Sequence, residues 1–183
     1  VLQVPGVGER NIHFRRLHYN ARILDVVQDL LGPNILLFHD QALFTPVRAG
    51  SSDSWNQDNV YRGWRPATLI SCWLALDDAD TENGAMQVVP GSHLRPLLHD
   101  QGASPDALLD TEENVDVSKA VTVPLPAGGC MFYHGQTLHC TQPNTTARQR
   151  RAFVMHYMQP DTHSNKDEPV GDRFAHPILR MSI

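Results

Sequence analysis

The pattern of apolar and polar residues divides the chain into one helical segment and a longer region of short strands. Between Arg16 and Leu31, apolar residues recur every three or four positions, which is the spacing of one buried helical face. Gly32-Pro33 follows this segment and is a typical helix stop. We therefore expect a helix that ends at Leu31 and packs against the main body of the protein. Its predicted buried face consists of Leu17, Ala21, Leu24, Val27, Leu30 and Leu31.

After this helix, short apolar or alternating runs are separated by turn residues, a pattern typical of β-strands. Turns are indicated at Glu82-Asn83-Gly84 and Pro90-Gly91-Ser92, among other places. One helix followed by many short strands favours an antiparallel sandwich or barrel over alternating βαβ units. The predicted strands cover residues 35–44, 68–76, 85–89, 121–125, 130–133 and 151–158.

Two segments have little periodicity. Residues 99–119 are polar and include an acidic patch, and we expect a long surface loop that either serves as a lid or is a mere insertion. The last fifteen residues are predicted to form a loosely attached tail.

Composition limits the class of protein. A length of 183 residues with 41% hydrophobic content suits one compact domain over residues 1–183. The net charge of −5, without any run of five like charges, argues against a nucleic-acid partner. No apolar stretch approaches the roughly 20 residues of a membrane span and no signal peptide is visible, so we expect a cytoplasmic protein. The cysteines form no CxxC pair and are predicted to be free thiols: Cys72, Cys130 and Cys140.

Candidate chemistry lies in Trp55-Asn56-Gln57-Asp58 and, far downstream, in His139 and Arg150. In an extended strand, residues two apart face the same side, so positions 56 and 58 can address one point. A carboxylate with imidazoles on one face is the arrangement of non-haem Fe(II) oxygenases. Arg150 adds a planar cation that can pair bidentately with the carboxylate of an oxo-acid co-substrate.

The order of these and other motifs resembles the phytanoyl-CoA dioxygenase family of Fe(II)/2-oxoglutarate-dependent oxygenases, which typically reads Trp-His-Gln-Asp at the first site. The resemblance covers residues 35–157. Its motifs are Trp55-Asn56-Gln57-Asp58, Ser71-Cys72-Trp73-Leu74-Ala75-Leu76, Glu82-Asn83-Gly84-Ala85-Met86, Pro90-Gly91-Ser92-His93, and His139-Cys140-Thr141-Gln142-Pro143-Asn144 leading to Arg150.

The resemblance implies a mainly β fold, a double-stranded β-helix or jelly-roll barrel with one or more packing helices near the N-terminus. From the resemblance we expect the helical part ahead of the barrel to be shortened relative to the family. The implied activity is that of a 2-oxoglutarate-dependent dioxygenase that uses O₂ to hydroxylate a small organic metabolite or acyl derivative. The Pro-Gly-Ser-His stretch is expected to be a structural turn at the pocket rim, so His93 is not a proposed ligand.

The resemblance also implies residue roles. Asp58, His139 and Arg150 would carry the reaction, with Fe(II) held at Asn56, Asp58 and His139. Arg150 would clamp the distal carboxylate of 2-oxoglutarate. Trp73 and Thr141 would lie beside that co-substrate.

A substrate pocket is expected near the strand that begins at Arg150, because residues 150, 152, 154 and 156 share one face. Simple core packing is the alternative for Met86 and His156. The candidate pocket residues are Gln41, Tyr61, Met86 and His156.

The chain departs from the family pattern at two positions. Thr45 stands where the family commonly has a lysine, which removes one positive contact. Asn56 stands in place of an imidazole; its amide is also neutral but is a weaker iron donor, and we expect metal affinity to fall by roughly one to three orders of magnitude. Recruitment of His134 is one possible rescue.

Three explanations for Asn56 stay open at this point. It is a natural ligand variant in an active oxygenase, a natural loss that leaves a degenerate jelly-roll binding protein, or an engineered substitution. A further alternative, a cupin-like hydrolase or isomerase, is supported only by the shared barrel fold, and a fold alone does not determine function.

Overall fold

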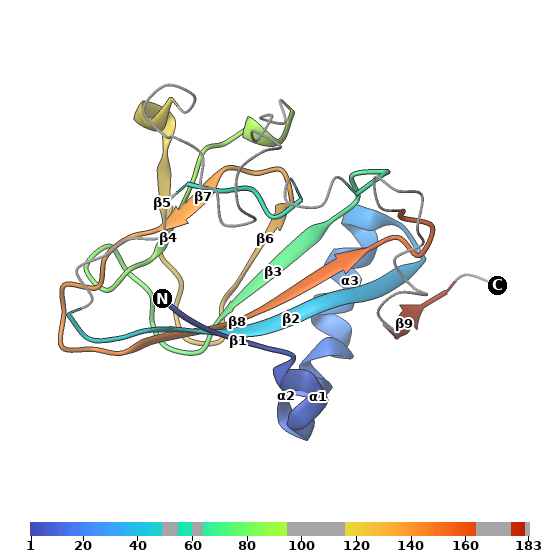
Figure 1. Cartoon of the computed structure of the whole chain (residues 1–183), viewed down its shortest axis with the longest axis horizontal. Coiled ribbons are helices and arrows are strands. Elements are labelled where there is room, and N and C mark those ends of the chain that lie inside the picture. The colour runs from blue at the N-terminus through green and yellow to red at the C-terminus, as the bar shows by residue number, and fades with distance from the viewer. Residues whose placement is uncertain (49–54, 60–63, 95–115, 164–176, 182–183) are drawn as a thin grey trace, which may run out of the picture.

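The computed structural model describes residues 1–48, 55–59, 64–94, 116–163 and 177–181, and its strands form two antiparallel sheets (Figure 1). The large sheet has the order β1-β2-β8-β3-β6, with β9 also paired to β2, and the small sheet has the order β5-β4-β7. The large-sheet strands are β1 (Leu2–Pro5), β2 (Ile35–Thr45), β3 (Ile70–Ala75), β6 (Cys130–His134), β8 (Arg150–Met158) and β9 (Ile178–Arg180). The small-sheet strands are β4 (Met86–Val88), β5 (Val121–Val123) and β7 (His139–Thr141).

Helices cover one face of the large sheet (Figure 1). The apolar core beneath them joins helix residues such as Val27 to sheet residues such as Phe153 and Tyr157, all fully buried. The helices are α1 (Val7–Arg10), α2 (Ile12–His18) and α3 (Ala21–Leu31), and short 3-10 turns are η1 (Ser92–Leu94) and η2 (Val117–Lys119). None of the helices in the described ranges is long and apolar enough to cross a membrane.

The single helix predicted over residues 16–31 is wrong at its start. The helix is interrupted at Tyr19-Asn20, between α2 and α3. The Asn20 side chain accepts a 3.0 Å hydrogen bond from the Arg22 backbone amide, which makes Asn20 the N-cap of α3. The predicted stop is confirmed, since α3 ends at Leu31 and Gly32 has a φ of 101°. Leu30 is 56% exposed and does not belong to the buried face.

All six predicted strands are present, with bounds that shift by at most two residues. The short strands β1 and β7 were not predicted. The prediction of a loose tail is wrong for β9, which pairs with β2 and is tied to α3 by a 2.6 Å ion pair between Arg180 and Asp25. Most of the predicted 99–119 loop lies outside the described residues. As predicted, no disulfide forms among the three cysteines, all of which lie in the described ranges: Cys72, Cys130 and Cys140.

The two sheets face each other across a second apolar cluster. Trp73 and Val154 contribute to it from the large sheet, and Met86 contributes from the small sheet. Because side chains alternate along β8, the same face that carries Val154 also carries Arg150 and His156. This inner face carries three of the predicted site residues, Trp73, Arg150 and His156.

An ion pair at the end of β3 gives a pH-dependent prediction. Arg151 donates two side-chain hydrogen bonds of 2.8 Å and one backbone hydrogen bond of 2.9 Å to the carboxylate of Asp77, and the side-chain bond in particular holds the pKa of Asp77 below its usual value. A lowered carboxyl pKa adds stability above the unfolded value of about 3.9, and this stability is lost as pH falls through the folded pKa.

We expect Asp77→Asn to lower the free energy of unfolding at pH 7 by at most about 1 kcal/mol, because the exposed Arg151 is screened by solvent. The difference from the unaltered chain should shrink at pH 3. Urea unfolding at both pH values measures this, and an equal difference at both would contradict the assignment.

Candidate metal and co-substrate site

The structure brings Asp58 and His139 together although they are far apart in sequence. A β-bridge joins Asn56 to His139 through two backbone hydrogen bonds of 2.9 and 3.0 Å, and this holds the segment 55–59 against β7. The Nε2 atom of His139 then lies 3.6 Å from Oδ1 of Asp58. Two donor atoms at this separation can share one divalent ion with bonds of about 2.1 Å.

The ring of His139 is oriented from behind. Its Nδ1 atom lies 2.9 Å from the carbonyl oxygen of Thr137, so Nδ1 carries the proton and donates it. The other ring nitrogen, Nε2, therefore presents its lone pair toward Asp58, which is the tautomer a metal ligand needs. The Pro-Gly-Ser-His turn supports this placement, because the Ser92 hydroxyl accepts a 2.8 Å hydrogen bond from the Leu138 amide.

The carboxylate of Asp58 is surrounded by hydrogen-bonding groups. Burial raises its pKa, but attraction to His139 and His156 when these rings are protonated, together with hydrogen bonds from Ser71 and Tyr133, outweighs burial, and the net shift is downward. Burial, and then the charge of Asp58, raise the pKa of Tyr133 well above its ordinary value. The carboxylate therefore stays ionised and the phenol stays protonated at neutral pH.

The sequence predicted that Asn56 and Asp58 share one extended strand, and the structure does not show this. Only Asn56 takes part in the β-bridge, and Asp58 begins a turn. The side-chain Nδ2 atom of Asn56 donates a 3.4 Å hydrogen bond to the carbonyl oxygen of His139. Within the described residues, no group of three or more His, Cys, Asp or Glu side chains is placed to hold a metal, so two strong ligands and one amide are what this segment offers.

His134 does not replace the missing imidazole. Its Nε2 atom lies 2.9 Å from the carbonyl oxygen of Ala67, and its Nδ1 atom accepts a hydrogen bond from the Gln136 amide. With both ring nitrogens engaged in this way, the hypothesis of a rescue by His134 is wrong.

Arg150 is a fully buried cation at the start of β8. Its guanidinium carbon lies 5.5 Å from the ring centroid of Trp73, and Thr45 is its cross-strand neighbour on β2. Its planar guanidinium can donate two parallel hydrogen bonds to a carboxylate. An anionic ligand therefore suits this position.

Two further donors surround the same place. The indole N–H of Trp73 and the hydroxyl of Thr45 are buried and have no hydrogen-bond partner among the described residues. In the sequence, Thr45 is notable only as the replacement of a lysine found in the family. The structure places its hydroxyl beside Arg150. A carboxylate would accept from these groups, so the residues present fit the distal end of an oxo-acid.

The Asn83-Gly84 turn leaves space beside Arg150. Gly84 has a φ of 98°, and a Cβ atom there would lie 2.7 Å from the carbonyl oxygen of Gln142 and 3.6 Å from Nη2 of Arg150. Glycine is therefore required for both the backbone conformation and the close approach. Thr141 is buried on β7, two residues after His139 and so on the same face of the strand.

The candidate pocket residues are placed differently from one another. Gln41 and His156 lie on the inner face of the large sheet, in register with Val154 and Ser71 respectively. Met86 is 3% exposed and packs in the cluster between the sheets. Tyr61 lies outside the described residues.

Sequence reasoning missed Ser71, Tyr133 and His39. The period-two spacing that places Trp73 on the inner face also places Ser71 there, and this signal was available in the sequence. The ring of His39 stacks on that of His156 at 6.0 Å between centroids. That contact depends on a shift in strand register between Leu37 and His39, which no local pattern indicates.

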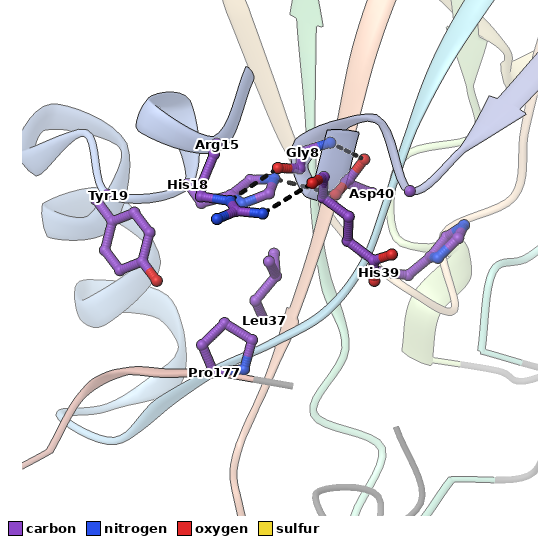
Figure 2. Close-up of a pocket in the computed structure, with 10 residues that line it drawn as sticks. Gly8, Arg15, His18, Tyr19, Leu37, His39, Asp40 and Pro177 are labelled. Atoms are coloured by element: carbon purple, nitrogen blue, oxygen red, sulfur yellow. Dashed lines mark hydrogen bonds and ion pairs between the residues drawn. The ribbon is translucent and has the colours of Figure 1, made fainter. Parts of the chain in front are cut away.

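A separate hollow of about 310 Å³ lies between the N-terminal helices and β2 (Figure 2). It contains a buried ion pair of 3.2 Å between His18 and Asp40. Figure 2 shows the ring of His39 turned away from His18 and Arg15. The hollow contains none of the predicted metal or co-substrate residues and is distinct from the site around Asp58.

Comparison with known proteins identifies the family of the chain. The family model for phytanoyl-CoA dioxygenase (PhyH) matches residues 3–152, which is most of the chain. The chain belongs to the phytanoyl-CoA dioxygenase family. It is 31% identical over 153 residues to the peroxisomal phytanoyl-CoA dioxygenase of Homo sapiens, covering 77% of this chain and 44% of that protein. The chain spans about half the length of the curated relatives it matches.

Solved structures of the family extend the likeness to nearly the whole chain. The apo non-heme monooxygenase ThoJ superposes with a TM-score of 0.79 at 29% identity, covering 98% of this chain and 66% of ThoJ. The epimerase SnoN, in complex with Fe³⁺, alpha ketoglutarate and nogalamycin RO, superposes with a TM-score of 0.77 at 29% identity, covering 92% of this chain and 66% of SnoN. The mainly β, double-stranded β-helix fold predicted from the sequence is thereby confirmed.

Proposed function

We propose that this chain is an Fe(II)/2-oxoglutarate-dependent dioxygenase that hydroxylates a small organic metabolite or acyl derivative. The observation that carries the proposal is the pairing of Asp58 with the correctly oriented ring of His139, 3.6 Å apart. The buried cation of Arg150 supports it from the same inner face of the fold. Iron with 2-oxoglutarate and O₂ supplies oxidative decarboxylation of the co-substrate coupled to hydroxylation of a C–H bond.

The protein's own residues bind and orient the reactants in this proposal. Asp58 and His139 would hold the ion, with the amide oxygen of Asn56 as a weak third donor. Arg150 neutralises the distal carboxylate of 2-oxoglutarate, and Trp73 and Thr45 donate hydrogen bonds to it. Thr141 contributes a hydroxyl from β7.

The substrate is proposed to lie along the inner face of the large sheet. Gln41 and His156 offer hydrogen bonds there, and Met86 limits the volume on the side of the small sheet. Tyr61 is kept as a proposed pocket residue from the sequence. The cytoplasmic location also stays a prediction, and the human and rat relatives are named peroxisomal.

Anaerobic titration with Fe(II) and 2-oxoglutarate tests the proposal directly. We expect the weak visible charge-transfer absorption of the iron–oxo-acid chelate, and succinate on admission of air. Absence of both in the folded 183-residue chain would refute the proposed activity.

A substitution at Arg150 tests the co-substrate anchor. Arg150→Lys keeps the charge but removes the planar pair of donors, so we expect the KM for 2-oxoglutarate to rise about tenfold or more, with Fe(II) affinity changed little. Arg151→Lys is the matched control, because Arg151 faces solvent on the opposite side of β8. Equal KM values in the two variants would contradict the anchor.

The second candidate function is a degenerate jelly-roll that binds a small carboxylate without turnover. Asn56 is the observation that favours it, because the described residues offer only Asp58 and His139 as strong metal ligands. Isothermal titration with 2-oxoglutarate in the presence of EDTA separates the two functions. Undiminished binding without metal favours the degenerate protein, and metal-dependent binding favours the oxygenase.

A further inference from the structure

Ser71, near the start of β3, lies between the side chains of Asp58 and His156. It is fully buried, and its hydroxyl donates a 2.6 Å hydrogen bond to Oδ2 of Asp58. The Oγ atom of Ser71 also lies 2.9 Å from Nδ1 of His156 on the neighbouring strand β8. Ser71 and His156 are cross-strand partners, so the sheet itself fixes this contact.

The proton count of the serine determines the direction of these bonds. A hydroxyl has one hydrogen, and here the carboxylate accepts it. The Ser71 oxygen can then only accept from His156, which places a hydrogen on Nδ1 of that ring. The hydrogen bonds therefore run from His156 to Ser71 to Asp58, and the stacked ring of His39 packs against the His156 end.

The two oxygens of Asp58 consequently have different environments. Oδ2 accepts from Ser71 and lies 3.8 Å from His156, whereas Oδ1 is the oxygen closest to His139. The hydrogen bond at Oδ2 favours an orientation in which Oδ1 alone faces His139.

We infer that Ser71 is a positioning residue that restricts Asp58 to metal binding through Oδ1 and couples this carboxylate to His156. The inference rests on the proposed metal site at Asp58 and His139. Groups that orient a metal ligand typically contribute 10- to 100-fold to metal affinity. The contribution matters more where Asn56 supplies only an amide, because fewer strong ligands remain to fix the ion.

Cobalt(II) binding to the full chain tests the inference without requiring turnover, since the visible absorption of cobalt reports its ligand geometry. We expect Ser71→Ala to bind cobalt about 10- to 100-fold more weakly, with an altered spectrum, and Ser71→Thr, which keeps the hydroxyl, to restore both. Cys72→Ala is the matched control: it removes a buried side chain from the next position of β3 on the opposite face and should leave affinity and spectrum unchanged.

The outcomes separate the inference from the proposed function. If the unaltered chain binds cobalt and Ser71→Ala, folded by circular dichroism, binds it with the same affinity and spectrum, the role of Ser71 is refuted and the metal site stands. If the unaltered chain binds no cobalt, both are refuted. Equal losses in Ser71→Ala and Cys72→Ala would show a general effect on β3 and would also overturn the role of Ser71.

Discussion

Asp58→Ala is expected to abolish measurable metal binding. Asp58 is the one carboxylate beside the Nε2 atom of His139 in the described part of the chain, and Asn56 cannot compensate for it, because an amide is a neutral and weak donor. We expect affinity for Fe(II) or Co(II) to fall by more than about 100-fold, since changes that do not even touch the metal cost 10- to 100-fold. Equilibrium titration followed by metal analysis of the desalted protein measures this.

A matched control separates lost ligation from lost stability. Asp40 is also a buried carboxylate paired with a histidine, but it faces the N-terminal helices, where it contacts His18 and the Gly8 amide. Asp40→Ala should lower the melting temperature and leave metal affinity within about twofold. If Asp58→Ala retains metal, or if both variants lose it equally, Asp58 is not the ligand.

The sequence predicted the longer strands well because they are long enough to show a pattern. β2, β3 and β8 each carry an apolar run or alternation that extends over several residues. β1 and β7 have four and three residues, and the break in the predicted helix depends on the single cap at Asn20. Features of this size are set by tertiary contacts and hydrogen bonds more than by periodicity.

The site residues also divide into those that the sequence predicted and those that depend on tertiary contacts. Motif order indicated Asp58, His139 and Arg150, and the fold brings the first two within 3.6 Å of one another. Ser71 and His39 were missed because their roles depend on which residues of neighbouring strands stand opposite each other. Strand alternation could have placed Ser71 on the face of Trp73, but only the register of β3 with β8 sets it against His156.

The most informative substitution is Asn56→His. The backbone of Asn56 is already bonded to His139 in both directions, so a new side chain at this position needs no rearrangement of the segment. An imidazole would add a third strong ligand beside Asp58 and His139. We expect metal affinity to rise by roughly one to three orders of magnitude, from the preference of iron for imidazole over amide donors.

Asn56→Ala, compared with Asn56→His, distinguishes the explanations for the native asparagine. If the amide is a working ligand, the alanine variant binds Fe(II) more weakly than the unaltered chain; if the amide is not a ligand, the two bind alike. Succinate formation then separates enzyme from degenerate protein. Turnover that appears only in Asn56→His identifies a site that lost catalysis at this residue, whereas turnover in the unaltered chain identifies an active variant. No gain in metal affinity on Asn56→His would contradict the assignment of position 56 to the metal site, because the side chain at this position would then not reach the ion shared by Asp58 and His139.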